Sequence, residues 1–385
     1  MENRYGPARA RRGFLRHAAA WSAGLAAWPL ARAQGEALLL AQSIALSGPL
    51  ADLGQAMHEG AKACFAAVNA QGGIHGRRIE LMTRDDAYDV KRAVENLKTF
   101  IADPKVFALF NCMGTPMIEA LLPLIKGSEL PCFAPFTGAT SARPADMRNV
   151  FNIRASYPEE AERLIEHLAT IGIRKIAVAY QNNSFGKEVA QACDAAMRRR
   201  QVQPVAAVTV ENSGADAEGA AAKVVAAGPE AVVLGLAGKP AAGFVRAARA
   251  QRKGLSLYAL SVMGSAATLN ALGDDAVGIA VSQVVPLPSN GATPVVRDFL
   301  QAWRGAGVSL EPSHLALEGY INARVFVEAL RRAGAQPTRA HFIEAAWGLK
   351  RLDLGGYELG FDHPGRSASR FVELTMVGKG GRFIR

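Results

Sequence analysis

The sequence has few of the residues and motifs on which metal sites and many enzymes depend. Its 385 residues include only four cysteines, none in a CxxC pair, and seven histidines without the spacing of metal ligands. The GxSxG turn of serine hydrolases, the HExxH zinc motif and the P-loop of nucleotide-binding proteins are all absent. We therefore predict no metal site, no cofactor and no enzymatic activity, although a catalytic triad assembled from distant residues would leave no such local motif.

An apolar segment long enough to span a membrane is also missing. The apolar stretch at residues 18–30 is shorter than the about 20 residues that a bilayer span needs, and no later stretch qualifies. It follows RRGFLR at residues 11–16, which resembles a twin-arginine export signal, and it precedes a small-residue cleavage site at Ala33. We therefore expect a soluble protein that is exported to the periplasm, starts near Gln34 and is not inserted in the membrane.

A strong excess of one charge is lacking as well. The formal net charge is +10, but residues 1–33 hold six arginines and one glutamate, so the remainder has 38 basic and 33 acidic residues, a net charge of about +5. The densest basic run, residues 198–200, lies at an expected helix end, where cations favour the helix dipole. Because no aromatic residues interleave with this run, we predict no nucleic-acid binding.

What the chain does contain is a regular alternation of strand and helix patterns. In the first part, helical patterns separate short apolar strands at residues 38–46, 79–83, 107–110 and 131–135. The pattern restarts near residue 152, with strands at residues 175–180, 205–210, 231–235, 257–260 and 279–284. Such repetition predicts an α/β fold with two doubly wound parallel sheets, each with helices on both faces.

The last third of the chain departs from this alternation. A proline-rich passage at residues 285–294 interrupts the second unit and is typical of a connection. Helical patterns then follow at residues 296–303, 315–333 and 338–348, and residues 371–383 have the pattern of a β-hairpin. With 385 residues, half of them apolar, the chain is long enough for two domains.

Residues 107–143 combine two strand ends with turns that suit an anion. After the first strand, Thr115 can cap a helix in which Pro116 takes the first position. After the second strand, a turn of small residues includes Phe136, Thr137 and Gly138. Because neighbouring parallel strands end at one edge, both turns would present N–H groups and hydroxyls to the carboxylate of a small ligand. Alternatively, both turns are ordinary connections of a doubly wound sheet.

Several segments carry a family resemblance: SGPLADLG, NAQGGIHGRRIEL, the GTP turn, PFTGA and YQNNSFGKEVA. Together with the expected export signal, they resemble periplasmic solute-binding proteins of ABC importers. The type is the one that binds branched-chain amino acids (Leu/Ile/Val) and has the type I periplasmic-binding fold. The resemblance covers essentially everything after Ala33.

The resemblance implies two lobes that are joined by a three-segment hinge and close on a ligand. The N-terminal lobe would comprise residues 34–154 and 288–354, and the C-terminal lobe residues 155–287 and 355–385. The three crossings would lie near residues 152–157, 285–289 and 352–361. The liganded protein, expected to be a monomer, would dock on the membrane permease subunits of the importer. A ligand-sensing subunit for a membrane receptor is the alternative, and an exported hydrolase is a further one.

The resemblance also implies ligand-binding residues in both lobes. The turns at Thr115 and at residues 136–138 would bind the carboxylate and polar head of the ligand, between bulky side chains from both lobes. The full predicted set is Leu53, Thr115, Pro116, Phe136, Thr137, Gly138, Phe185, Leu236 and Met263. Some of these have a structural alternative, because Thr115 can be a helix cap only, Phe185 can pack the turn at Gly186, and Phe136 and Met263 can be core residues.

One segment departs from the family pattern. Amino-acid binders of this type carry an acidic residue near position 261 that pairs with the ammonium group of the ligand, whereas residues 261–265 are SVMGS. Burying an unpaired ammonium group against Val262 and Met263 would cost several kcal/mol. We therefore predict an aromatic or apolar carboxylic acid, or an amide. An amino acid stays possible if Asp52, Asp85 or Asp86 supplies the charge.

Overall fold

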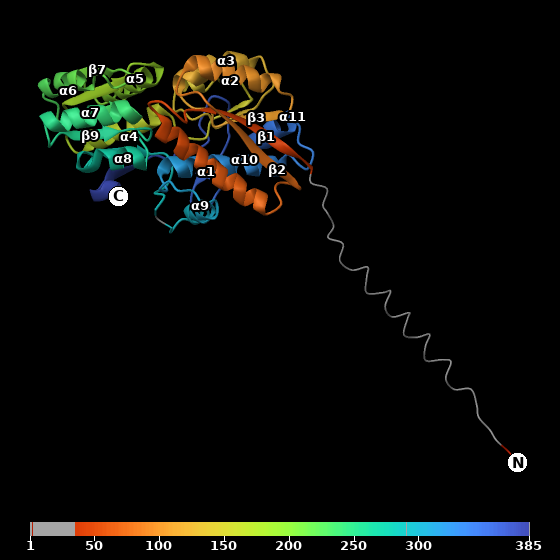
Figure 1. Cartoon of the computed structure of the whole chain (residues 1–385). Helices are drawn as coiled ribbons and strands as arrows, with labels where there is room; N and C mark the ends of the chain where they lie inside the picture. The colour runs from red at the N-terminus through yellow and green to blue at the C-terminus, as the bar shows by residue number, and fades with distance from the viewer. Residues whose placement is uncertain (1, 3–34, 290, 385) are drawn as a thin grey trace.

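The computed structural model describes residue 2, residues 35–289 and residues 291–384. In it, two sheets form the centres of two lobes that lie side by side, each covered by helices (Figure 1). The predicted α/β fold with two parallel-sheet cores is therefore confirmed. The expected export signal and cleavage site lie outside the described residues. Within the described part of the chain, no helix is both long and apolar enough to cross a bilayer.

The first lobe is built on a five-stranded parallel sheet with the order β2-β1-β3-β4-β5. The strands are β1 (Gly35–Ile44), β2 (Arg77–Asp85), β3 (Val106–Phe110), β4 (Cys132–Phe133) and β5 (Val150–Phe151). The helices between them are α1 (Ala51–Ala70), α2 (Val90–Ala102) and α3 (Thr115–Lys126), followed by the short 3₁₀ helix η1 (Thr140–Ala142).

Three late helices return to this first lobe, as the resemblance implies. They are α9 (Pro294–Gly305), α10 (His314–Arg332) and α11 (Arg339–Trp347), and both α9 and α10 pack on α1. The α1–α10 contact depends on two glycines. A Cβ atom on Gly60 would lie 1.8 Å from the Ala316 carbonyl oxygen, and a Cβ atom on Gly319 would lie 2.1 Å from the Met57 carbonyl oxygen. The backbones of the two helices therefore touch.

The second lobe is built on a seven-stranded sheet with the order β14-β13-β10-β9-β8-β6-β7. Its parallel strands are β6 (Ile176–Gln181), β7 (Ala206–Val210), β8 (Ala231–Gly235), β9 (Ser256–Ala259) and β10 (Ala280–Gln283). Its helices are α4 (Tyr157–Thr170), α5 (Ser184–Arg198), α6 (Ala217–Ala226), α7 (Gly238–Gln251), α8 (Ala266–Leu272) and the 3₁₀ helix η2 (Gly273–Ala276).

The end of the chain adds an antiparallel edge to this second sheet. Strand β13 (Glu373–Val377) pairs with β10, and β14 (Phe383–Ile384) pairs with β13 after the short 3₁₀ helix η3 (Lys379–Gly381). The predicted terminal β-hairpin is confirmed, and its connecting helix η3 packs beside α8 (Figure 1).

The third crossing between the lobes lies later in the chain than residues 352–361, where the sequence predicts it. The segment predicted as the third crossing forms a small hairpin of its own, β11 (Leu352–Asp353) with β12 (Glu358–Leu359). Tyr357 and Phe361 of this region are buried in the core around the first sheet. The chain crosses after Phe361, where the Ala368 N–H donates to the Asn152 carbonyl (2.8 Å) and the first and third crossings run side by side.

The four cysteines are buried free thiols. Cys132 begins β4, which is only two residues long, and pairs beside Leu109 of β3. Burial raises the pKa of Cys112 to about 12, so that thiol is protonated and unreactive at neutral pH.

Candidate functional site

The first turn of the candidate site, which follows β3, is shaped by a glycine. Gly114 has a φ angle of 96°, which favours glycine, and it occupies the N-cap position of α3. Thr115 was predicted to cap this helix but lies inside its first turn and makes no cap hydrogen bond. Its hydroxyl is therefore available to the site, and it lies 2.7 Å from the hydroxyl of Thr137.

The second turn, which follows β4, is joined to the first by backbone hydrogen bonds. The Phe136 N–H donates to the Cys112 carbonyl (2.8 Å), and the Gly114 N–H donates to the Phe136 carbonyl (3.1 Å). Behind this turn, the buried Arg143 guanidinium donates to the Ala139 carbonyl (2.6 Å). The predicted meeting of the two turns at one sheet edge is therefore what the structure shows, and both turns are fixed by hydrogen bonds.

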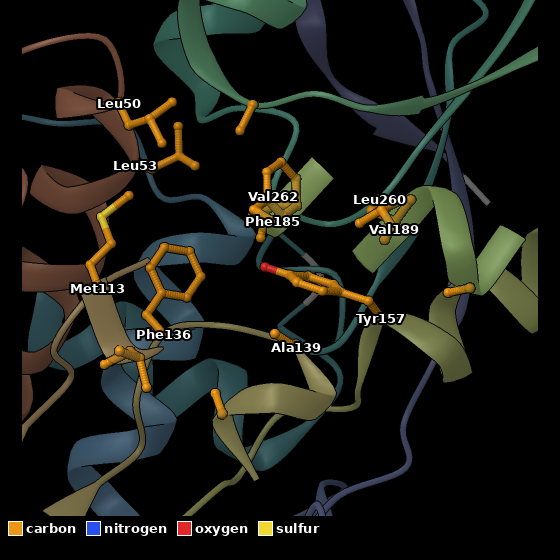
Figure 2. Close-up of a cluster of buried hydrophobic side chains, with 14 of the residues drawn as sticks. Leu50, Leu53, Met113, Phe136, Ala139, Tyr157, Phe185, Val189, Leu260 and Val262 are labelled. Atoms are coloured by element: carbon orange, nitrogen blue, oxygen red, sulfur yellow. The ribbon is translucent and has the colours of Figure 1, made fainter. Parts of the chain in front are cut away.

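Tyr157, at the end of the first crossing, fills the space in front of these turns. Its ring lies so close to Gly138 that a Cβ atom on that glycine would be 2.4 Å from the ring carbon Cδ1. Burial raises the pKa of the phenol, and the nearby Arg154, Thr137 and Gly138 partly offset this rise. Figure 2 shows this hydroxyl pointing into the space between Phe136 and Phe185.

The second lobe supplies the opposite wall from three loops. The Asn183 side chain caps α5 by accepting from the Gly186 N–H (3.1 Å), which places Phe185 at the start of the helix facing the first lobe. The Phe185 ring packs edge-on against Tyr157, with ring centroids 5.3 Å apart. Ala237, before α7, and Val262, after β9, complete this wall.

Together these walls leave a cavity of about 20 Å³, room for about one water molecule. The lobes are therefore closed, and side chains occupy the space between them. Among the described residues that line the cavity there is no lysine, arginine, aspartate or glutamate. The apolar side chains of the lining belong to one buried cluster with members from both lobes. The lining consists of Leu50, Leu53, Tyr88, Met113, Gly114, Thr115, Phe136, Tyr157, Phe185, Ala237 and Val262.

Polar contacts between the lobes surround this apolar cavity. Asp52 of α1 accepts hydrogen bonds from the Ser265 hydroxyl (2.9 Å) and the Thr268 hydroxyl at the start of α8. Glu188 of α5 accepts from the Ser141 hydroxyl (3.0 Å), and the Lys239 N–H donates to the Pro49 carbonyl (3.2 Å). These contacts join the two lobes only while they are closed.

The carboxylates that could pair with an ammonium group are already engaged. Asp52 holds the opposite lobe, as described above, and Asp85 accepts from the Ser47 hydroxyl and from loop N–H groups. Asp86 accepts from the Ser43 hydroxyl (2.8 Å) and the Tyr88 N–H (2.9 Å), and burial raises its pKa to about 6. None of the three lines the cavity.

A buried ion cluster lies behind the aromatic wall and spans the two lobes. Arg154 of the first crossing lies 3.1 Å from Glu160 of α4 and 3.5 Å from Glu318 of α10. Its guanidinium carbon lies 5.3 Å from the Phe136 ring centroid. Burial raises the pKa of Glu318 to about 7, so the charge of this cluster changes near neutral pH.

The predicted site residues fall into three groups. Leu53, Thr115, Phe136 and Phe185 line the cavity, whereas Thr137 and Gly138 lie directly behind it, in contact with Tyr157. The remaining three do not line it: Pro116 lies in the first turn of α3, Leu236 lies in the core of the second lobe, and Met263 lines a different cavity.

Sequence reasoning missed several lining residues, of which Tyr157 fills the most central place. One signal could have found Tyr157, because it is the only aromatic residue in the predicted first crossing, residues 152–157. No comparable signal marks Tyr88, Met113 or Ala237, which reach the cavity from irregular loops.

Comparison with known proteins gives matches along nearly the whole chain. Residues 40–382 match a protein family described as periplasmic binding protein. A substrate-binding periplasmic protein from Ralstonia solanacearum is 33% identical, with a TM-score of 0.85 over 90% of this chain and 99% of that one. A possible leucine/isoleucine/valine-binding protein from Rhodopirellula baltica SH 1 is 29% identical, with a TM-score of 0.84 over 91% of this chain and 97% of that one.

A curated relative gives the same result. The Leu/Ile/Val-binding protein homolog 3 of Brucella melitensis biotype 1 is 22% identical over 332 residues, which are 86% of this chain and 88% of that protein. These relatives are named as binding proteins and not as enzymes.

Proposed function

Because the chain belongs to the periplasmic binding protein family, we propose that it is the exported substrate-binding component of an ABC importer and captures one small ligand between its lobes. The ligand would contact both lobes and so stabilise the closed form, which then docks on the membrane permease. The polar contacts of Asp52 and Glu188 support this mechanism, because they join the two lobes across the cleft. No bond of the ligand is broken in this scheme.

The proposed ligand is an aromatic or apolar carboxylic acid, or the corresponding amide. The observation that carries this proposal is a cavity with hydroxyl groups and a backbone N–H at one end and no charged side chain in its lining. Such an end suits a carboxylate at the N-terminus of α3. An ammonium group would be buried beside Val262 without a partner, which costs several kcal/mol.

We assign the predicted site residues to roles on this basis. Thr115, Thr137 and Gly138 would hold the oxygen atoms of the ligand, and Leu53, Phe136 and Phe185 would form the walls around its apolar part. Pro116 would fix the start of α3 without touching the ligand. The lobes must separate before the ligand enters, because the closed cavity of about 20 Å³ is too small for it.

The closed cavity supports a further step, in which the ligand takes the place of a protein group. The Tyr157 phenol now occupies the space in front of Thr137 and Gly138, which would bind the carboxylate. A ligand oxygen that binds there would displace this phenol. Tyr157 then turns aside and makes room for the body of the ligand.

The test uses a matched series of ligands that differ in one group: 3-phenylpropanoic acid, its amide and phenylalanine. Calorimetry and thermal denaturation should show binding of the acid or the amide and none of phenylalanine, and a ligand at 100 times its Kd should add about 2.7 kcal/mol of stability. If only free amino acids bind, the assignment of the ligand class is wrong, although capture between the lobes would stand.

A pair of threonine variants tests the location of the site. Thr115→Val removes one hydroxyl at nearly constant volume and should weaken binding of the acid at least about tenfold, because hydrogen bonds to charged groups contribute about 1.5–3 kcal/mol. Thr209→Val, on the exposed face of β7, is the matched control and should bind as the wild type does. Equal affinities in the two variants would place the ligand elsewhere.

A further inference from the structure

Arg143 is a buried cation that contacts only neutral oxygen atoms. Its Nη1 donates to the Ala139 carbonyl (2.6 Å) and the Thr137 carbonyl (3.4 Å), and its Nη2 donates to the Arg154 carbonyl (3.1 Å). Its Nε donates to the Ser367 hydroxyl (3.2 Å). Among the residues that the structure describes, no carboxylate forms an ion pair with this guanidinium. A buried charge without a counter-charge is costly, so an anion nearby would stabilise it.

Arg154, the other buried arginine behind the turn after β4, is different because it is paired with two carboxylates of the ion cluster. Burial and the charge of Arg154 lower the pKa of Arg143 to about 10, and Glu159 and Glu188 offset this shift only in part. The Arg143 guanidinium therefore still carries its charge at neutral pH. Of the two arginines, it is the one that lacks a carboxylate in contact.

The carbonyls that Arg143 binds belong to two peptide groups of the turn. A hydrogen bond from a cation to a carbonyl oxygen polarises the peptide, so the N–H of the same peptide becomes a stronger donor to an anion. The peptide between Ala139 and Thr140 shows this arrangement, because the Thr140 N–H donates to the carboxylate of Glu188 from the second lobe. The turn therefore already holds one carboxylate through a peptide that Arg143 polarises.

The second of these peptides joins Thr137 to Gly138, at the back of the cleft. Gly138 lies against Tyr157, since a Cβ atom on it would be 2.4 Å from the ring, and Tyr157 lines the cavity. Among the described residues, no backbone carbonyl accepts from the Gly138 N–H. This N–H is thus placed to donate to a ligand carboxylate as the Thr140 N–H donates to Glu188.

From these features we propose that Arg143 is the buried counter-charge of the ligand and makes the cleft select a carboxylate over the corresponding amide. This proposal rests on the proposed function, since it takes the ligand to bind at Thr137 and Gly138. Arg143 acts through the peptide and through its electric field, without touching the ligand. The field is effective there because the cavity lining is mainly apolar and screens charge weakly.

The acid and the amide of 3-phenylpropanoic acid are matched probes, because they differ in charge and have nearly the same shape. In calorimetric titrations of the whole chain, the acid should bind the wild type at least about tenfold more tightly than the amide. Arg143→Gln removes the charge and should bring the two affinities close to equality, whereas Arg143→Lys keeps the charge and should keep most of the preference. A change in folding or closure alone would weaken both ligands alike, so the ratio of the two Kd values reports the charge.

Arg249→Gln is the matched control. The Arg249 guanidinium also donates to backbone carbonyls, but in the second lobe, where it binds those of Lys253 and Leu255 (both 2.7 Å). This variant should lose stability and keep the wild-type ratio of the two Kd values.

Glu188→Gln keeps the test decisive if Arg143→Gln does not fold. It leaves an acceptor for the Thr140 N–H but removes a negative charge that shares Arg143, so the preference for the acid should increase about twofold or more. The proposal is overturned if the wild type binds acid and amide alike, if Arg143→Gln keeps the preference, if Arg143→Lys loses it, or if Glu188→Gln fails to increase it. Capture between the lobes would stand in each of these cases. If neither the acid nor the amide binds, the proposed ligand class fails together with this proposal.

Discussion

Removal of the Tyr157 hydroxyl is expected to strengthen ligand binding. In the closed form without ligand, the Tyr157 ring packs on Gly138 and its hydroxyl lies near the Thr137 side chain, and the proposed ligand must displace it. Tyr157→Phe removes the polar contact of that hydroxyl only in the unliganded form. Such a contact contributes at most about 1 kcal/mol, so the variant should bind 3-phenylpropanoic acid up to about fivefold more tightly.

The same variant should be less stable without ligand by a similar amount. Calorimetry gives the Kd, and thermal denaturation with and without the acid separates the effect on stability from the effect on binding. Tyr320→Phe is the control, because it removes a buried tyrosine hydroxyl that accepts from Arg324 (3.0 Å) in α10, outside the cleft. It should lose stability and keep the wild-type Kd. A fivefold weaker Kd for Tyr157→Phe would mean that the phenol binds the ligand and does not compete with it, and our reasoning would fail.

Three other changes follow from single observations. Gly138→Ala should lower the free energy of unfolding by about 1–3 kcal/mol, because the new Cβ would lie 2.4 Å from the Tyr157 ring. In a protein that already carries Tyr157→Ala, chemical denaturation should show a smaller loss of stability from the same change. The pKa of Glu318 is raised from 4.5 to about 7, so the folded form binds this proton more tightly than the unfolded chain does and stability should increase as the pH falls from about 8 to about 5. Glu318→Gln should remove that part of the pH dependence in denaturation curves. Gly60→Ala should destabilise the protein by at least about 1 kcal/mol, because the α1–α10 contact has no room for a Cβ atom. Gly219 is the control, because it is a helical glycine of α6 with open space around it. Gly219→Ala should therefore stabilise the protein by about 0.5–1 kcal/mol.

The fold was predictable from the sequence where an element is long enough to show its period. The buried strands β6 and β8 and the amphipathic helices α2 and α5 have clear patterns, and the terminal hairpin has glycines between its strands. By contrast, β5 and β11 are two residues long, too short for any periodicity to mark them. The third crossing was misplaced for the same reason, and the lobe limits drawn from the sequence stay a prediction.

The candidate site was predictable only in part, because its residues lie in turns. Thr115 and Phe136 follow strand ends and could be found from that position, but the Thr115 hydroxyl meets that of Thr137 and does not cap α3, because Gly114 takes the cap position. Tyr157 lies in the cavity because the first crossing passes in front of Gly138, which is a property of the chain path and not of any local pattern.

The loop after β9 decides the ligand class, and there a shift of one residue matters. Both Val262 and Met263 are apolar, so the sequence suggested an apolar wall whichever of them faces the cleft. The structure places Val262 in the cleft, whereas Met263 lines a different cavity. The Met263 carbonyl accepts from the Gly238 N–H (2.8 Å). Only the side chain at position 262 can therefore meet a ligand in the cleft from this loop. Since valine offers no charge and Asp52 is held by α8, an ammonium group would stay unpaired there, and the preference for a ligand without one rests on this single position.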